Sequence, residues 1–418
     1  MTGKTDQIVE HLFRAEYGKL VATMTSIFGT ANIQLAEDVV QETLITALGN
    51  WGTKGIPDNP TAWLVQVAKR KALNELKRNQ MVWMHHQADP IGMGGSHDAD
   101  PVFLENEIED SQLRMIFTCC HPLLNVESQI ALTLKTLCGF GVGEVARALL
   151  TTESTINKRL YRAKKSIRDS NLPFSIPQGA ELEKRLKVVG LALYLLFNEG
   201  YNSTSKDTII QKELCLEAIR LVKLLLLHFD NNQELCALLA LMCFHTARFE
   251  ARIDNHGAIV LFADQDRALW NKELIVIGMK YMQKSMGARR LSAYHIEAGI
   301  AAEHCMAESF ETTNWQSIFD QYKLLEKLKP NPVIALNLAV IQSQLEGIES
   351  SLRSLDKLKN DGALSHYHLL PATQGIFHMK LGNFRKAIAH LEAALHLEPS
   401  ATESSLIQNR IEECKKML

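Results

Sequence analysis

The sequence lacks the long apolar runs and the cysteine framework that mark membrane and secreted proteins. No apolar run approaches the ~18 residues that a membrane-spanning helix needs, and the first ten residues are polar and include acids. The eight cysteines are scattered, most of them within apolar helical patterns, which is typical of reduced thiols. We therefore expect a cytoplasmic protein with no membrane segment.

Signatures of catalysis and of metal binding are missing as well. The chain has no Gly-rich phosphate loop, no HExxH pair and no nucleophile elbow. Cys119, Cys120 and His121 suggest zinc, but zinc ligand pairs are usually separated by roughly two to four residues, and adjacent cysteines fit that spacing poorly. We expect no catalytic residue, no metal and no cofactor, so the chain is not predicted to be an enzyme.

Helical periodicity runs through most of the chain. Its 418 residues exceed one ordinary core, and a hydrophobic share of 46% with 22% charged residues is typical of folded globular proteins. Apolar residues recur with a 3.6-residue period, as at Leu12, Leu20, Met24 and Ile27, and no stretch alternates convincingly with period two. The predicted fold class is all-α.

Charge divides the chain into blocks. Residues 1–83 carry nine basic and eight acidic groups, residues 84–110 carry seven acids and no basic group, and residues 111–170 carry nine basic groups and four acids. The acidic stretch opens with Gly-rich polar sequence, and two prolines bracket a second break at 171–177. The predicted domains are 1–83, an acidic flexible linker at 84–104, 105–170, and 178–418.

The basic block contains the pattern of a helix-turn-helix at 141–169. A short helix would bury Val142, Val145, Ala146 and Leu149, and Thr151 or Thr152 would cap a second helix that buries one apolar face. The second helix of this motif enters the major groove, and its cations neutralise phosphates. The residues predicted to contact DNA are Ser154, Thr155, Asn157, Lys158, Arg159, Arg162 and Lys165. The alternative interpretation is a solvated basic helix in a plain bundle.

The first block contains two further polar helix patterns. Asp38 and Gln41 lie three residues apart and share a helix face, with Glu37 and Glu42 beside them. A later helix combines Trp63, which could stack on an unpaired base, with cations. Its polar residues are Lys69, Arg70, Asn74, Lys77 and Arg78. The simpler alternatives are a solvated polar face and a tryptophan that anchors the core.

These residues resemble a known family. The run Ala36-Glu37-Asp38-x-x-Gln41-Glu42, the loop from Trp51 to Pro60 and the helix that follows are similar to region 2 of extracytoplasmic-function (ECF) sigma-70 factors. The helix-turn-helix is similar to their region 4. Further matches, in 117–122, 195–201 and 264–267, resemble the ECF subgroup with a C-terminal tetratricopeptide-like (TPR-like) extension.

The resemblance implies partners and roles. Asp38 and Gln41, flanked by Glu37 and Glu42, would dock on the β′ clamp helices of core RNA polymerase. The loop from Trp51 to Pro60 and the helix with Trp63 would open and read the −10 element, and the helix from Glu153 to Arg168 would read the −35 element. Extracting a base from duplex DNA costs a few kcal/mol, which a pocket and stacking can offset.

The C-terminal block shows repeats toward its end. Ala387, Leu391, Ala394 and Pro399 have TPR spacing, and the same spacing recurs 69 residues earlier from Ile318 to Pro330. Such repeats bind proteins or peptides on a concave face. For Asp264, Asp266 and Arg267 a structural role, as a helix cap or in a salt bridge, is favoured over recognition.

Two functions therefore compete with the ECF sigma factor. One is a helix-turn-helix transcriptional regulator whose repeat domain senses a ligand or peptide, and the other is a repeat scaffold with incidental basic surface. A regulator has no need for the face of Asp38 and Gln41 or for the basic helix with Trp63.

Overall fold

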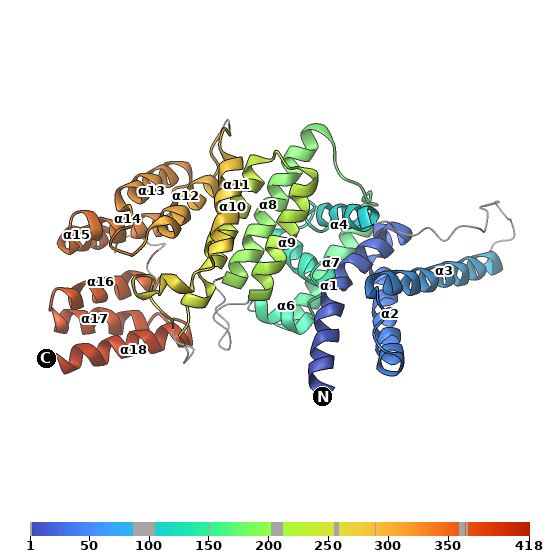
Figure 1. Cartoon of the computed structure of the whole chain (residues 1–418), viewed down its shortest axis with the longest axis horizontal. Coiled ribbons are helices and arrows are strands. Elements are labelled where there is room, and N and C mark those ends of the chain that lie inside the picture. Colours follow the sequence, from blue (N-terminus) through green and yellow to red (C-terminus); the bar gives the residue numbers. More distant parts are fainter. Residues whose placement is uncertain are drawn as a thin grey trace. The chain divides into compact units, whose positions relative to one another are not determined.

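The computed structural model describes residues 2–86, 105–149, 151–201, 212–254, 259–288, 290–358, 364 and 367–418 (Figure 1). The expected all-α fold is confirmed: within these ranges the chain is helical, with one isolated bridge between Ile253 and Ile259. The chain forms two compact units, residues 1–196 and 197–418. The linker predicted at 84–104 falls mostly on 87–104, outside the described residues.

The first unit begins with three helices around α1, which packs on α2 and α3 and also on α4. Its apolar face explains this position, because Leu20, Val21 and Met24 are fully buried. Asn59 caps α3 by accepting a hydrogen bond from the Ala62 N–H at 2.9 Å. The helices are α1 (Thr2–Phe28), η1 (Thr30–Asn32), α2 (Ile33–Lys54), α3 (Pro60–His86), α4 (Glu105–Cys119), α5 (Val126–Thr136), α6 (Val142–Ala148), α7 (Glu153–Asp169) and α8 (Gly179–Tyr201), whose last residues belong to the second unit.

Gly18 on α1 lies against the end of α5. A Cβ atom at this position would be 1.9 Å from the carbonyl oxygen of Leu137, far inside any permitted contact. Only glycine therefore allows α1 to approach the end of α5 this closely. The contact joins the first predicted domain to the third.

The second unit is a succession of packed helices. The helix α10 is apolar on all sides and is buried against α9, α11 and α12, as a central helix must be. The helices are α9 (Lys212–His228), α10 (Gln233–Ala247), η2 (Phe249–Ala251), η3 (Phe262–Asp264), η4 (Arg267–Leu269), α11 (Lys272–Ser285), α12 (Ala293–Met306), α13 (Trp315–Leu328), α14 (Pro332–Leu345), α15 (Ile348–Leu358), α16 (Leu369–Lys380), α17 (Phe384–Leu395) and α18 (Ala401–Lys416).

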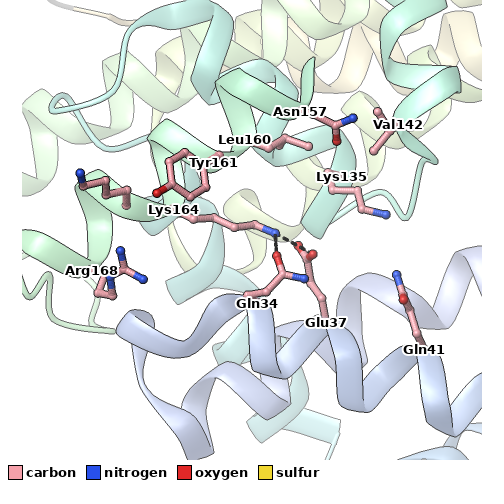
Figure 2. A pocket seen from close by; sticks show the side chains of 11 residues that line it. Gln34, Glu37, Gln41, Lys135, Val142, Asn157, Leu160, Tyr161, Lys164 and Arg168 are labelled. Atoms are coloured by element: carbon pink, nitrogen blue, oxygen red, sulfur yellow. Dashed lines mark hydrogen bonds and ion pairs between the residues drawn. The ribbon is translucent and has the colours of Figure 1, made fainter. Parts of the chain in front are cut away.

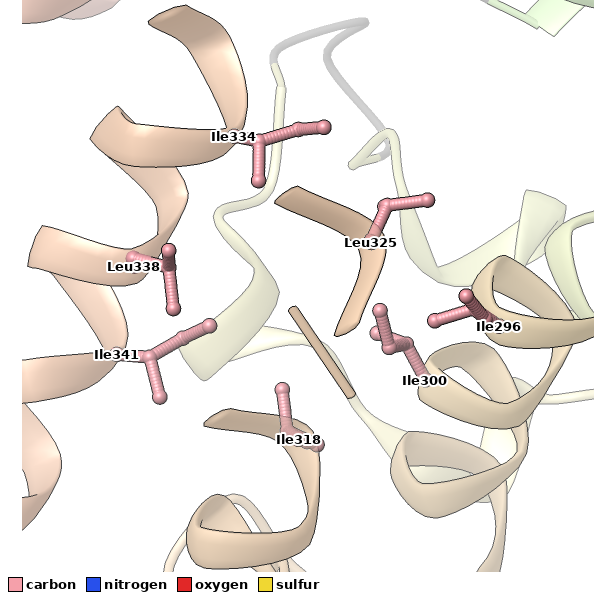
Figure 3. Packing of buried hydrophobic residues seen from close by; sticks show 7 residues of the cluster. All are labelled: Ile296, Ile300, Ile318, Leu325, Ile334, Leu338 and Ile341. Atoms are coloured by element: carbon pink, nitrogen blue, oxygen red, sulfur yellow. The ribbon is translucent and has the colours of Figure 1, made fainter. Parts of the chain in front are cut away.

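Branched apolar side chains join α12, α13 and α14 into one layer (Figure 3). Ile318 and Leu325 of α13 lie between side chains from the two flanking helices, as the close-up shows. The full cluster is Ile296, Ile300, Ile318, Leu325, Ile334, Leu338 and Ile341. Each helix thus buries its apolar stripe only by stacking on its neighbours.

The last three helices repeat this arrangement. α16 and α17 approach each other so closely at Gly375 that a Cβ there would be 2.7 Å from the Leu391 side chain, so this position requires glycine. Gly382 turns the chain between these helices with φ +73°, a conformation that favours glycine. Ala387 and Ala394, which carry the repeat spacing, are fully buried.

The described helices include none that is both long enough and apolar enough to cross a membrane.

Candidate functional site

The helix-turn-helix pattern is present as α6 and α7. Thr152, one of the two predicted caps, accepts a hydrogen bond from the Thr155 N–H at 3.2 Å and starts α7. The buried face of α7 is as predicted: Ile156, Leu160, Ala163 and Ile167 are all buried. Of the four residues predicted to be buried in the first helix, Val145 and Ala146 are buried, whereas Val142 and Leu149 are partly exposed. Most of the remaining side chains of α7 are exposed.

The polar residues predicted to contact DNA lie on this remaining surface. Asn157, Lys158 and Arg162 are exposed, as are Ser154 and Lys165. The side chains of Thr155 and Arg159 are partly exposed. A helix presenting hydrogen-bonding groups at its N-terminal end and cations toward its C-terminal end can bind base edges and phosphates together.

The helix α2 presents an exposed face with a mixed character. Asp38, Gln41 and Glu42 are exposed. Asp38 accepts a hydrogen bond from the Gln34 side chain at 2.9 Å, and Glu42 lies 3.4 Å from the Lys71 ammonium. The next turns of this face add two apolar side chains that are largely exposed.

Those two side chains are Ile45, 68% exposed, and Leu48, 55% exposed. Their positions follow Gln41 at helical spacing, so the polar and apolar groups form one surface. Apolar groups exposed beside polar ones are typical of a protein-binding surface. The sequence analysis missed Ile45 and Leu48, although their spacing from Gln41 was a usable signal.

Glu37 differs from its three predicted companions because it is buried. Its carboxylate receives the Lys164 ammonium of α7 at 2.7 Å, and the same ammonium donates to the Gln34 side chain at 2.8 Å. Only 3% of the Glu37 side chain and 15% of the Lys164 side chain are exposed. The recognition-type helix α7 is thus tied to α2 by a buried ion pair.

A cleft of about 460 Å³ lies between α2 and α7 (Figure 2). Figure 2 shows Gln34, Glu37 and Gln41 along α2, with Lys164 reaching across toward Glu37. The residues lining the cleft are Gln34, Glu37, Gln41, Lys135, Val142, Asn157, Leu160, Tyr161, Lys164, Lys165 and Arg168. Two predicted surfaces, one on α2 and one on α7, therefore face the same cleft.

A second contact joins the segment before α2 to the segment after α7. The Thr30 hydroxyl donates a hydrogen bond to the Leu172 carbonyl, just beyond the end of α7. The Lys164 pair joins α2 to α7, the Thr30 hydrogen bond joins η1 to the end of α7, and the close contact at Gly18 joins α1 to the end of α5.

The helix α3 holds the residues predicted to read unpaired DNA. Trp63 is partly exposed and its ring lies 5.4 Å from that of the buried Trp51. The exposed residues are Arg70, Asn74 and Lys77, and Lys69 is partly exposed. Arg78 belongs to α3, but its side chain lies outside the described residues. Trp63 therefore contacts the interior while keeping part of its ring accessible.

The cysteines considered for zinc lie in the interior. The thiol of Cys119 lies 3.1 Å from the Thr136 hydroxyl, and burial raises the pKa of Cys119 above its usual range. Burial also raises the pKa of Cys120 to about 11. Within the described ranges, no group of three or more His, Cys, Asp or Glu residues is arranged to hold a metal ion.

Comparison with known proteins assigns families to both units. Residues 12–81 match Sigma-70 region 2, residues 114–167 match Sigma-70, region 4, and residues 185–286 match a family of unknown function, DUF6596. The chain belongs to the sigma-70 family. It is therefore an RNA polymerase sigma factor, with core polymerase and promoter DNA as its partners, and this family consists of initiation factors rather than enzymes.

One relative shares this architecture along almost the whole chain. It is an uncharacterized protein of Rhizobium meliloti (strain 1021), 35% identical over 386 residues, which cover 91% of this chain and 90% of the relative.

Proposed function

We propose that this chain is an ECF-type sigma factor that recognises −10 and −35 promoter elements and initiates transcription. The observation that carries the proposal is the pair of exposed surfaces on α2 and α7, one suited to a protein and the other to duplex DNA. Both surfaces occur on the segments that match regions 2 and 4. A regulator of the ordinary helix-turn-helix kind would need the second surface only.

The face of α2 is the proposed polymerase contact. Asp38, Gln41 and Glu42 supply polar groups, and Ile45 and Leu48 add apolar area at the same face. A protein interface typically surrounds such apolar groups with polar contacts that fix orientation. In this proposal the β′ clamp helices cover this face.

The helix α3 is the proposed reader of the −10 element. Arg70, Asn74 and Lys77 are exposed along it, and Lys69 is partly exposed. The accessible part of the Trp63 ring would stack on an unpaired base, while Trp51 supports the ring from the interior. The exposed cations would neutralise the phosphates of the opened strand.

The helix α7 is the proposed reader of the −35 element. A helix about 10–12 Å wide fills a major groove about 12 Å wide, which leaves no room for α2 along the same flank. We therefore propose that α7 separates from α2 before it enters DNA. Separation would also break the ion pair between Glu37 and Lys164, and would expose the side of Gln41 that lines the cleft.

The second unit is proposed to modulate this activity through a TPR-like surface. The repeat spacing found in the sequence lies on α13 and α17, which are the second helices of the stacked pairs α12–α13 and α16–α17. Such stacks bind protein or peptide partners without taking part in DNA recognition.

The test is run-off transcription with purified core polymerase and promoter fragments from the source genome. The wild-type chain is expected to produce specific transcripts, and joint Asp38→Ala and Gln41→Ala substitution is expected to abolish them. Ser26→Ala serves as the matched control, because Ser26 is polar and lies on α1 away from this face. Separate binding assays with core polymerase and with promoter DNA accompany the transcription.

Each outcome decides between the candidates. Loss of transcripts together with loss of polymerase binding supports the proposed α2 contact. DNA binding without transcripts or polymerase binding favours the helix-turn-helix regulator. Equal transcription by the double variant and the wild type would remove the proposed role of α2.

A further inference from the structure

Three arginines of the second unit lie over aromatic rings. Arg248 and Arg267 both lie over Phe262 and Trp270, and Arg252 lies over Tyr201. Arg248 follows α10, Arg252 follows η2, and Arg267 begins η4. All three therefore belong to the segment between α10 and α11. The Arg248 guanidinium lies 4.3 Å from the Phe262 ring centroid, and that of Arg267 lies 4.7 Å from the Trp270 ring centroid. We call Arg248, Arg252 and Arg267 the arginine cluster.

Each member is held in place by neutral groups. Arg267 donates to the carbonyls of His304 and Ala307, at 2.5 Å and 2.7 Å, at the end of α12. Arg252 donates to the Tyr201 carbonyl at 3.1 Å and lies 3.8 Å from the Tyr201 ring centroid. Carbonyl groups at helix ends orient these guanidinium groups, but they do not neutralise them.

Arg248 completes the cluster with an amide partner. Its Nε–H donates to the Gln265 side-chain oxygen at 3.3 Å, and Gln265 in turn donates to the Val260 carbonyl at 3.2 Å. The Arg248 and Arg267 side chains are partly buried, and this burial lowers the pKa of both. Within the described residues, none of the three arginines forms an ion pair with a carboxylate.

The acids of the neighbourhood have other arrangements. Asp264 is largely exposed and lies 4.0 Å from Arg410. The Asp266 side chain accepts the Ala268 N–H at 2.9 Å. Glu311 is exposed, and its negative charge favours the charged form of Arg267. The two side chains form no ion pair in the described part of the chain. Partial burial of like charges that no carboxylate pairs with is unfavourable.

Within the part of the chain that the structure describes, buried nitrogen atoms beside the cluster also lack hydrogen-bond partners. The Trp270 Nε1 is one of them, on a side chain that is only 4% exposed, and an indole N–H can only donate. The Nδ1 atoms of His245 and His304 are also buried without a partner. Burial, reinforced by the arginines, lowers the pKa of both histidines to about 3, so both rings are neutral.

The neighbourhood therefore has surplus donors and positive charge, and its missing element is an anionic acceptor. We propose that the arginine cluster binds an oxyanion group, a phosphate or a carboxylate, of a small ligand. Planar guanidinium groups pair with both kinds of oxyanion in a forked geometry, and the unpartnered indole N–H adds a neutral donor. No family assignment or relative records a ligand here, and the proposal does not depend on the sigma function.

The aromatic rings stabilise the guanidinium groups and are expected to strengthen anion binding. A cation over an aromatic face within ~6 Å is stabilised without losing its donors, so the guanidinium edges stay available to a ligand. The low polarity of Phe262 and Trp270 strengthens an ion pair formed beside them. The site differs in this respect from the exposed cations of α7, where salt screens a bound phosphate.

The full-length protein is titrated with inorganic phosphate and, separately, with citrate, while potassium chloride keeps the ionic strength constant. Two-dimensional NMR follows the indole N–H signals of the five tryptophans, and a Trp270→Phe variant assigns one of them. Saturable binding is expected, with a downfield shift of the Trp270 signal and a rise in melting temperature. Phosphate alone, citrate alone or both would identify which oxyanion the site accepts.

Matched variants locate the binding. Arg252→Met is expected to weaken binding at least tenfold. Arg220→Met removes a guanidinium of the same unit that already pairs with Glu217 at 2.9 Å, and Arg162→Met removes an exposed cation of α7. Both controls are expected to stay within twofold of the wild type. If Arg252→Met does not fold, Arg252→Lys keeps the charge without the fork and is expected to bind several-fold more weakly.

Three results would overturn the proposal. The first is the absence of saturable binding by either anion. The second is a loss of binding in Arg162→Met that equals or exceeds the loss in the Arg252 variant, which would place the anion on α7. The third is saturation without any change at the Trp270 signal.

Discussion

Two cationic regions of this molecule differ in how exposed their cations are and in which groups those cations contact. On α7 the cations are mostly exposed, and the one that is withdrawn from water, Lys164, is neutralised by Glu37 at 2.7 Å. In the arginine cluster of the second unit, Arg248 and Arg267 are withdrawn from water and bond only to neutral groups in the described structure. The first region suits a long polyanion, and the second suits a small one.

The difference shows that net charge does not identify a ligand. Exposed cations spread along a helix match the regular phosphates of a duplex and release counterions when they bind. Buried guanidinium groups fixed by helix-end carbonyls can meet only a group small enough to reach them. Three experiments test this contrast, from the largest expected effect to the smallest.

Removing the buried cation of α7 is expected to open the first unit. Lys164→Met leaves Glu37 without its partner, and breaking a buried pair costs about 3–5 kcal/mol, a cost that opening reduces because it exposes the carboxylate to water. The distance between spin labels at Leu48 and Ser170 should then lengthen. Both positions are exposed. Lys165→Met is the control, because Lys165 lines the same cleft and forms no ion pair in the described region. Unchanged distances in Lys164→Met would mean that the ion pair does not hold the closed arrangement.

Removing two exposed cations of α7 is expected to weaken promoter binding. Arg162→Ala with Lys165→Ala should reduce affinity on the order of 10–100-fold and lower the slope of log affinity against log salt by about two. Fluorescence anisotropy over a salt series measures both quantities. Phosphate binding by the arginine cluster should not change, and a parallel loss there would break the contrast between the two regions.

Acidification is expected to destabilise the second unit by a smaller amount. His245 and His304 have pKa values of about 3 in the fold, below the ordinary value of about 6.5, so the unfolded chain takes up protons first as the pH falls. Stability is therefore present above about pH 6.5 and declines below it, by about 1 kcal/mol per histidine between pH 7 and 5.5. Hydrogen exchange in α10 measures this decline.

His245→Phe keeps a ring at that position and should remove about half of the dependence. Saturating phosphate should also reduce it, because a bound oxyanion favours the protonated ring. If neither His245→Phe nor phosphate alters the pH dependence, the two histidines are not its cause and are not coupled to anion binding at the arginine cluster.

Local chemistry made part of this structure predictable from the sequence. The cap at Thr152 and the buried face of α7 depend on spacing within one helix, and both were predicted correctly. The repeat spacing likewise placed Ala387 and Ala394 on a buried face. The roles of the exposed residues on α2, α3 and α7 stay predictions until binding is measured.

Contacts between distant segments were not predictable in this way. Glu37 was grouped with Asp38 on an exposed face, but its burial depends on Lys164, 127 residues away. The favoured structural roles are present at Asp266, whose side chain caps its own turn, and at Asp264, which forms an ion pair with Arg410. Arg267 bonds instead to carbonyl groups at the end of α12. No periodicity encodes such partners, because they follow from how the helices pack.

Gly18 has a mechanical consequence for the closed first unit. The clearance between α1 and the Leu137 carbonyl is too small for a single methyl group. One carbon atom added at this position would act as a wedge between the segments matched to regions 2 and 4. Gly18→Ala would then prop the sigma factor open while leaving every charge and every proposed contact residue in place, so steric fit alone could set the resting state of the molecule.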